Sequence, residues 1–199
     1  MMKRAVPLVL SAVLLTGCGS HSLQELQGGG RLTVGAPASA APGLVAGPDF
    51  NPADVMFLQM MLPHNAQGAK LARLAANRKI SDDARVLAAA IATTQEAEVT
   101  MMTGWLKGWK RPTAAPAGAH SSHGGHGLSD AQIKMISKTP DAEFEKRFLN
   151  ALISQQDDAV QMTKVELMAG QNAETKALAN RIQASRDAQI KQMMALVGK

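Results

Sequence analysis

The feature that most constrains the fold of this 199-residue chain is an internal repeat. When the sequence is shifted by 91 residues without a gap, its second half falls on its first. The matching residues are few, and they recur with the spacing of a buried helix face: Phe57–Leu58 on Phe148–Leu149, Leu87–Ala88 on Leu178–Ala179, Ile91 on Ile182, and Met102 on Met193. Such a repeat is one supersecondary unit that cannot bury its apolar face alone. We therefore predict an all-α fold, in which two similar helical hairpins close into one four-helix bundle. The alternative is two unrelated amphipathic hairpins.

The composition agrees with a helical fold. The chain has no Tyr, 2 Trp, 4 Phe and 12 Met, and it is dominated by good helix formers. A β-sandwich or barrel would use more aromatic and β-branched residues. The single Cys excludes an internal disulfide framework and a Cys-rich zinc site.

Capping residues predict the bounds of the first hairpin, over residues 50–110. Asn51–Pro52 provides a cap and a first helical position. The apolar period breaks between residues 77 and 80, and Ser81 then opens a second helix that runs to about Trp109.

The second hairpin, within residues 129–199, is marked in the same way. Ser129 with Gln132 is typical of a capping box for a short helix. Thr139–Pro140 starts a long helix that Gly170 ends. Asn172 caps the last helix, which reaches about Val197. We expect residues 50–199 to form one domain.

The N-terminus predicts export. A short positive segment precedes an apolar run over residues 5–15, which is too short for a permanent membrane span but right for a signal peptide. The run ends in Leu15–Thr16–Gly17–Cys18, which resembles a bacterial lipobox. We predict a signal peptide over residues 1–17 and a lipid on Cys18; the alternative is a conventional signal peptide with an incidental Cys.

Residues 18–49 are predicted to be a flexible tether from the membrane, because they are rich in Gly, Ala and Pro and offer no core. Cleavage would remove Lys3 and Arg4 from the 21 basic residues and leave 19 against 16 acidic ones. This excess, without a basic run, does not indicate nucleic-acid binding.

One polar group interrupts the apolar face of the first hairpin. On a helix, His64 lies beside Met60 and Met61, and Pro63 is expected to kink that helix. The candidate metal ligands of the two helices are His64, Met60, Met61, Gln95, Glu98 and Met102. Thioether with imidazole favours Cu(I), and the carboxylate widens the choice. The alternative is that the Met residues fill an aromatic-poor core and that His64 is a hydrogen-bonded core histidine.

A second candidate site lies in the linker, residues 111–128. His120, His123 and His126 are spaced three apart among Ser and Gly. Imidazoles in such a segment chelate Cu(II), Ni(II) or Zn(II) after folding around the ion. The alternative is a solvated linker with incidental histidines.

The segments Met56–Asn65 and Gln95–Val99, with Met102 and Trp105–Leu106, resemble the bacterial family called domain of unknown function 305. The resemblance covers about residues 50–197. It implies a ferritin-like helical bundle, usually exported, with some members associated with copper binding or resistance.

The sequence departs from the family pattern where a metal would bind. Asn65 stands for the second His of the first repeat, and Gln155–Gln156 stand for the His pair of the second repeat. Arg186 and Gln189 replace the Gln and Glu of the second repeat. Amides are poor ligands and an Arg opposes a cation, so only the first hairpin is expected to bind metal.

An enzyme is not indicated, because the chain has no Glu-x-x-His pair, phosphate loop or nucleophile beside His64. Two functions remain open. One is a membrane-anchored envelope lipoprotein that binds or buffers copper, as Cu(I) or Cu(II). The other is a degenerate member that serves as a structural or protein-interaction module. The sequence identifies no protein partner and leaves self-association open.

Overall fold

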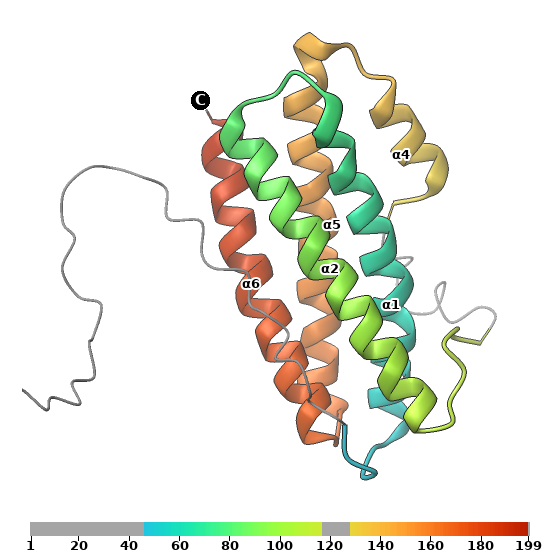
Figure 1. Ribbon diagram of the computed structural model, residues 1–199. Coiled ribbons are helices and arrows are strands. Elements are labelled where there is room, and N and C mark those ends of the chain that lie inside the picture. The colour runs from blue at the N-terminus through green and yellow to red at the C-terminus, as the bar shows by residue number, and fades with distance from the viewer. Residues whose placement is uncertain (1–45, 117–127, 199) are drawn as a thin grey trace, which may run out of the picture. The chain divides into compact units, whose positions relative to one another are not determined.

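The structure is a computed structural model that describes residues 46–116 and 128–198. It contains the four long helices expected from the repeat, and the predicted all-α, ferritin-like bundle of two hairpins is confirmed (Figure 1). The elements are α1 (Pro52–Ala72), the 3₁₀ helix η1 (Arg73–Asn77), α2 (Asp82–Gly108), α4 (Asp130–Ser137), α5 (Asp141–Ala169) and α6 (Ala173–Val197). Within these described ranges, no helix is long and apolar enough to cross a membrane.

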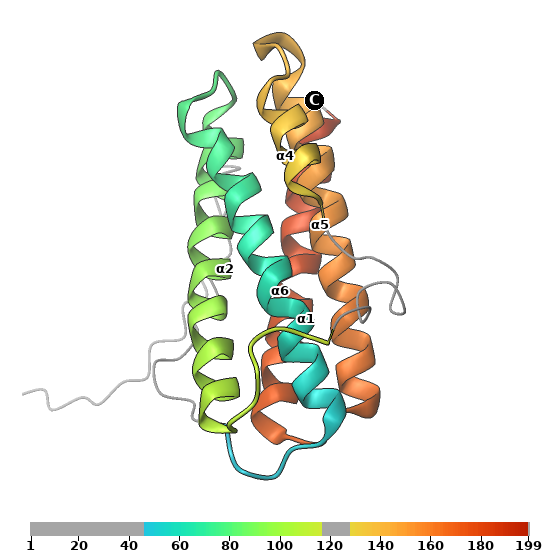
Figure 2. The same ribbon diagram turned by 90° about the vertical axis from the view of Figure 1, so that its right-hand side faces the viewer.

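The two hairpins pack against each other through all four long helices. Each hairpin is antiparallel, with α1 against α2 and α5 against α6. The hairpins meet where α1 contacts α5 and α2 contacts α6. The short helix α4 packs on α5, near the end of the bundle where α5 begins (Figure 2).

The helices begin where the capping residues predict. Asn51 accepts from the backbone N–H groups of Ala53 and Asp54, and the Asp54 side chain completes a capping box. Ser81 and Asn172 cap α2 and α6, and Ser129 forms the predicted capping box of α4. These bonds satisfy N–H groups that a helix start otherwise leaves without partners.

Two helix details bear on the local predictions. Helix α5 begins at Asp141, directly after the predicted Thr139–Pro140, and Pro140 gives it no side-chain cap. Helix α1 runs through Pro63 from Pro52 to Ala72, although Pro63 leaves the carbonyl of Gln59 without its helical donor. The kink expected at Pro63 stays a prediction.

The core consists of two apolar clusters at different heights of the bundle. One surrounds Met61, Met102 and Ile182, and the other surrounds Ile91, Phe148 and Met193. Along each long helix, residues of one cluster precede a short polar stretch and residues of the other follow it. A buried polar layer therefore separates the two apolar clusters.

Candidate metal centre

The polar layer crosses all four long helices at mid-height. Its members are buried, each at most 5% exposed: His64 and Asn65 of α1, Gln95 and Glu98 of α2, Gln155 and Gln156 of α5, and Arg186 of α6. A shift of 91 residues relates the two halves of this set, because it carries His64 to Gln155 and Gln95 to Arg186. The layer is thus the position of the family motif in both repeats, and the sequence-predicted residues His64, Gln95 and Glu98 all lie in it.

An ion pair between α2 and α6 forms the charged part of the layer. The Arg186 side chain is 0% exposed, and its Nη2 donates to Glu98 Oε2. The same carboxylate oxygen accepts from Asn65 Nδ2 at 2.8 Å. Charged groups are stable in an apolar core only when they are paired and hydrogen-bonded. Glu98 is therefore neutralised by a side chain of this same chain.

A chain of amides forms the rest of the layer. Gln95 Nε2 donates to Gln155 Oε1 and to Gln156 Oε1, each at 3.1 Å. Gln156 Nε2 in turn donates to Gln189 Oε1 at 2.5 Å. These bonds link α2, α5 and α6, so the amides that replace the expected metal ligands of the second repeat hold the helices together.

Gly68 is what allows the amides to approach α1. A Cβ atom at this position would lie 2.1 Å from Gln95 Oε1 and 2.2 Å from Gln155 Nε2. Both contacts are far shorter than van der Waals separation, so a side chain at this position would force the two buried amides out of their hydrogen-bonded positions. The sequence pattern did not identify Gly68, because a helical glycine carries no sign of what its helix packs against.

His64 belongs to the same hydrogen-bonded set. Gln155 Nε2 lies 3.1 Å from His64 Nδ1 and donates to the His64 carbonyl oxygen at 3.3 Å. The Gln155 amide and the His64 ring are thus within hydrogen-bond distance of each other across α1 and α5. His64 is therefore buried and within hydrogen-bond distance of Gln155, while its role as a metal ligand stays a prediction.

The candidate thioethers lie beside the layer, among apolar neighbours. Met60, Met61 and Met102 are 6%, 0% and 0% exposed and belong to one apolar cluster with Phe57 and Trp105. Packing of an aromatic-poor core accounts for this position.

The residues present do not fit a resident metal ion in the polar layer. In residues 46–116 and 128–198, no three His, Cys, Asp or Glu side chains are grouped so that they could hold one. Glu98 already accepts hydrogen bonds from Arg186 and Asn65, and His64 Nδ1 lies within hydrogen-bond distance of Gln155 Nε2. Of the donor set predicted from the first repeat, His64, Gln95 and Glu98 lie in the polar layer and the three Met residues lie in one apolar cluster, and the Glu98 carboxylate is already paired.

The other predicted sites fall outside the described residues. His120, His123 and His126 of the linker and Cys18 of the lipobox are among them. The nearest described thioether after the linker is Met135 of α4, whose side chain is 65% exposed. Met168 and Met194 are also exposed, at 80% and 60%.

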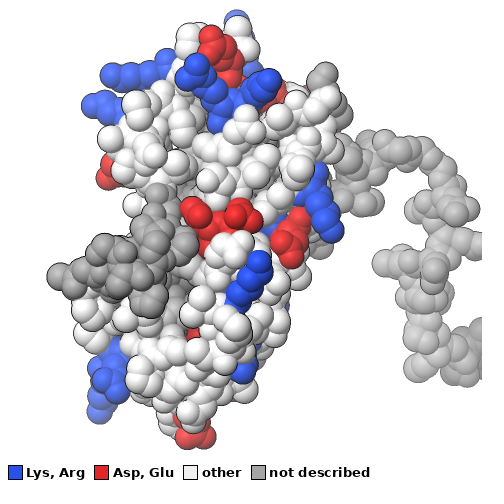
Figure 3. All heavy atoms as spheres, turned by 180° about the vertical axis from the view of Figure 1, so that it is seen from behind, with Lys and Arg blue, Asp and Glu red and all other residues white. Residues whose placement is uncertain are grey.

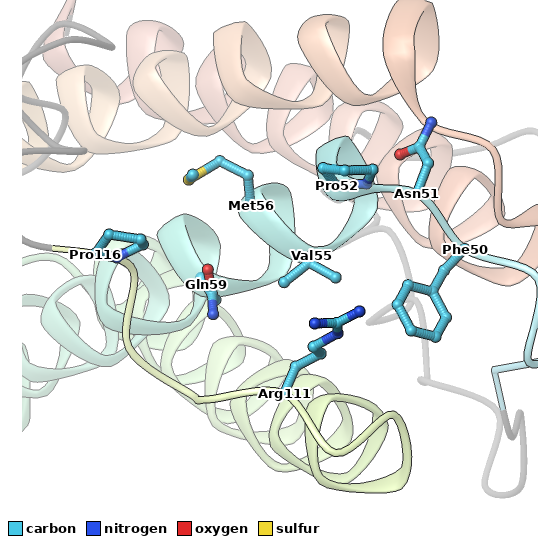
Figure 4. A pocket seen from close by; sticks show the side chains of 8 residues that line it. All are labelled: Phe50, Asn51, Pro52, Val55, Met56, Gln59, Arg111 and Pro116. Carbon is cyan, nitrogen blue, oxygen red and sulfur yellow. The ribbon is translucent and has the colours of Figure 1, made fainter.

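A pocket that the sequence did not predict lies at the start of α1. It has a volume of about 250 Å³ and is lined by Phe50, Asn51, Pro52, Val55, Met56, Gln59, Arg111 and Pro116 (Figure 4). Arg111 extends toward Phe50 and Val55, with its guanidinium carbon 5.5 Å from the centre of the Phe50 ring. Gln59 Nε2 donates to the carbonyl of Pro112 at 2.7 Å and fixes one wall. This wall is formed by residues 109–116, a non-helical segment whose path cannot be predicted from hydrophobic periodicity.

The charges on the surface give no broad field of one sign on the face shown in Figure 3. There, several Lys and Arg side chains lie at the upper end and others are scattered over the rest of the face, a small acidic group lies at mid-height, and most of the visible surface is uncharged. This face agrees with the small charge excess of the sequence.

A family model described as "Domain of unknown function (DUF305)" matches residues 54–197. The chain belongs to this DUF305 family, as the sequence resemblance predicted. No similar protein was found among curated sequences.

Solved structures of the family have the same fold. A DUF305 fragment from Deinococcus radiodurans is 30% identical, with a TM-score of 0.66 over 77% of this chain and 98% of that one. A DUF305 protein from Streptomyces coelicolor, described as a candidate secreted protein, is 25% identical, with a TM-score of 0.68 over 73% and 92%. CopM in its Cu(II)-bound form is 27% identical, with a TM-score of 0.64 over 73% and 95%.

Proposed function

We propose that this protein is an exported, lipid-anchored envelope protein that binds and buffers copper at low to moderate affinity. The observation that carries the proposal is the structural similarity to CopM, which has been solved with Cu(I) and with Cu(II) bound. Export is supported by the signal-like N-terminus and by the Streptomyces coelicolor relative.

The proposal locates copper at the linker histidines and at Met135 rather than in the polar layer. His120, His123 and His126 offer imidazoles for Cu(II), and the exposed thioether of Met135 on the neighbouring helix offers a soft ligand for Cu(I). His64 with Met60, Met61 and Met102 is the second donor set, and it would have to bind copper without the carboxylate of Glu98.

A second candidate function is a structural or interaction module of the envelope that has lost metal binding. The ion pair between Glu98 and Arg186 favours it, because a polar layer that is neutralised by its own side chains needs no metal.

A competition titration of the purified protein with Cu(I) and Cu(II) separates the two functions. We expect tighter binding than to an unrelated histidine-poor bundle, a loss in the triple variant His120→Ala, His123→Ala, His126→Ala, and a smaller loss of Cu(I) in Met135→Leu. Met194→Leu is the matched control, since Met194 is a thioether of similar exposure on another helix, 60% against 65% for Met135.

Binding that equals the unrelated bundle would reject the copper proposal and leave the interaction module. Loss of copper only in His64→Ala would move the site into the bundle.

A further inference from the structure

The one full cation in the polar layer is Arg186, and its surroundings do not satisfy it completely. Its guanidinium is wholly buried and contacts Glu98 through Nη2, while Nε and Nη1 have no hydrogen-bond partner among the described residues. A buried Arg that uses so few of its donors is not held for its hydrogen bonds alone. Its main contribution to the layer is the positive charge that neutralises the Glu98 carboxylate.

The repeat shows what this charge replaces. The position of Arg186 corresponds to Gln95 in the first repeat, so α6 brings a cation where α2 has a neutral amide. Two cations beside one carboxylate repel each other strongly in a core, where the effective dielectric constant is low. Arg186 is wholly buried, so a metal ion bound to Glu98 would share a desolvated site with the guanidinium or would have to displace it.

Oxygen ligands for a metal ion are otherwise present. Besides Glu98, the side-chain oxygens Oδ1 of Asn65 and Oε1 of Gln95 are buried and have no donor among the described residues. The Glu98 carboxylate and the imidazole in the same layer are ligand types that Zn²⁺ takes, and the amide oxygens, although weaker ligands, would complete its coordination. What distinguishes this layer from a metal site is therefore the guanidinium.

We propose that Arg186 is the resident cation of the bundle and the single residue that excludes metal ions from Glu98. The polar layer is neutral without metal, and the bundle folds and stays folded in the presence of a chelator. This inference goes beyond copper binding by the linker histidines and Met135, and it holds whether or not these residues bind copper.

The test is the thermal midpoint of three variants, each measured with a chelator and with excess Zn²⁺. Arg186→Gln gives this position the amide of the first repeat and leaves Glu98 buried without a counterion. We expect its midpoint with chelator to fall by about 10 °C or more, and Zn²⁺ to restore at least half of the loss, because an ion that binds only the folded state stabilises it.

Two matched variants isolate the cause. Arg186→Lys keeps the positive charge and is expected to gain no more from Zn²⁺ than the wild-type protein. The double variant Glu98→Gln, Arg186→Gln removes both charges and is expected to lose the extra zinc response. Zinc bound by the linker histidines is common to all of these chains and cancels in the comparison.

Equal zinc responses in Arg186→Gln and in the double variant would overturn the proposal. If Arg186→Gln does not fold even with Zn²⁺, the Zn²⁺ affinity of the wild-type protein is compared with that of the double variant. If Arg186 excludes metal from Glu98, removing both charges changes this affinity by no more than about twofold. An affinity about tenfold lower in the double variant would show that Glu98 binds Zn²⁺ even with Arg186 present, and it would overturn the proposal. The zinc arms do not depend on copper binding, so failure of the proposed function is a separate outcome.

Discussion

Asp54 and Glu145, 91 residues apart, each cap the second helix of the other hairpin. Asp54 Oδ1 on α1 accepts from the backbone N–H of Asn172 at 2.9 Å, at the start of α6. Glu145 Oε2 on α5 accepts from the backbone N–H of Ser81 at 2.9 Å, at the start of α2. Since Ser81 and Asn172 are also related by the same shift, the capping contact is repeated at both ends of the bundle and joins one hairpin to the other.

The two copies of this contact differ in burial, and this predicts unequal effects on stability. Asp54 is 0% exposed and also accepts from Asn51 and Gln171, whereas the contact of Glu145 is exposed. We expect Asp54→Ala to lower the free energy of unfolding by about 2–3 kcal/mol and Glu145→Ala by less than about 1 kcal/mol. Urea unfolding measures both, and equal losses would contradict the importance of burial.

A buried acid beside Asp54 predicts a pH dependence of stability. Burial, and then the hydrogen bond and charge of Asp54, raise the pKa of Glu166 to about 9 from 4.5, while Lys176 acts in the opposite direction. The folded protein therefore keeps a proton that the unfolded chain releases above pH 4.5. Stability from this group is complete below about pH 4.5 and falls as the pH rises toward 9, by at most about 1.4 kcal/mol per pH unit.

Glu166→Gln tests this effect, because the amide keeps the shape and cannot ionise. Between pH 5 and 9 we expect its unfolding free energy to fall less steeply than that of the wild-type protein, and to be higher at pH 9. Glu174→Gln, a carboxylate in the first turn of α6, is the control. Parallel curves for wild type and Glu166→Gln would show that Glu166 is ionised in the folded protein.

The close approach of the amides to α1 predicts opposite effects for two helical glycines. Gly68→Ala would place a Cβ against Gln95 and Gln155, so we expect a loss of roughly 2 kcal/mol or more. A Cβ at Gly104 in α2 meets nothing within 4 Å, so Gly104→Ala is expected to stabilise by about 0.5–1 kcal/mol. Thermal or urea unfolding compares the two, and a neutral Gly68→Ala would argue against the tight amide layer.

The lipobox predicts a covalent lipid on Cys18. Intact mass of the exported protein should show the lipid and the loss of residues 1–17, and Cys18→Ser should move the protein from the membrane fraction to the soluble fraction. An exported protein with an unmodified Cys18 would contradict the anchor.

Local sequence signals predicted the helices well, because each depends on neighbouring residues. Asn51, Ser81, Ser129 and Asn172 cap the helices as expected, and the 91-residue repeat predicted the pairing of the hairpins. Helix α5 follows the predicted Thr139–Pro140 without a side-chain cap.

The sequence predicted which positions form the candidate site but not their partners. The repeat identified Arg186 as a residue that opposes a metal in the second repeat. That its guanidinium contacts Glu98 of the first repeat depends on the rotation of α6 relative to α2, which periodicity does not specify. The approach to Gly68 and the pocket beside Arg111 depend on tertiary packing and loop course in the same way.

The most direct test of the account is the position of the metal in crystals of the wild-type protein soaked with Cu(I) or Ag(I). Anomalous scattering should show the ion beside the linker histidines or Met135, or beside His64 and its neighbouring thioethers, with Arg186 still paired to Glu98. An ion bound to the Glu98 carboxylate, with Arg186 turned away, would contradict the account.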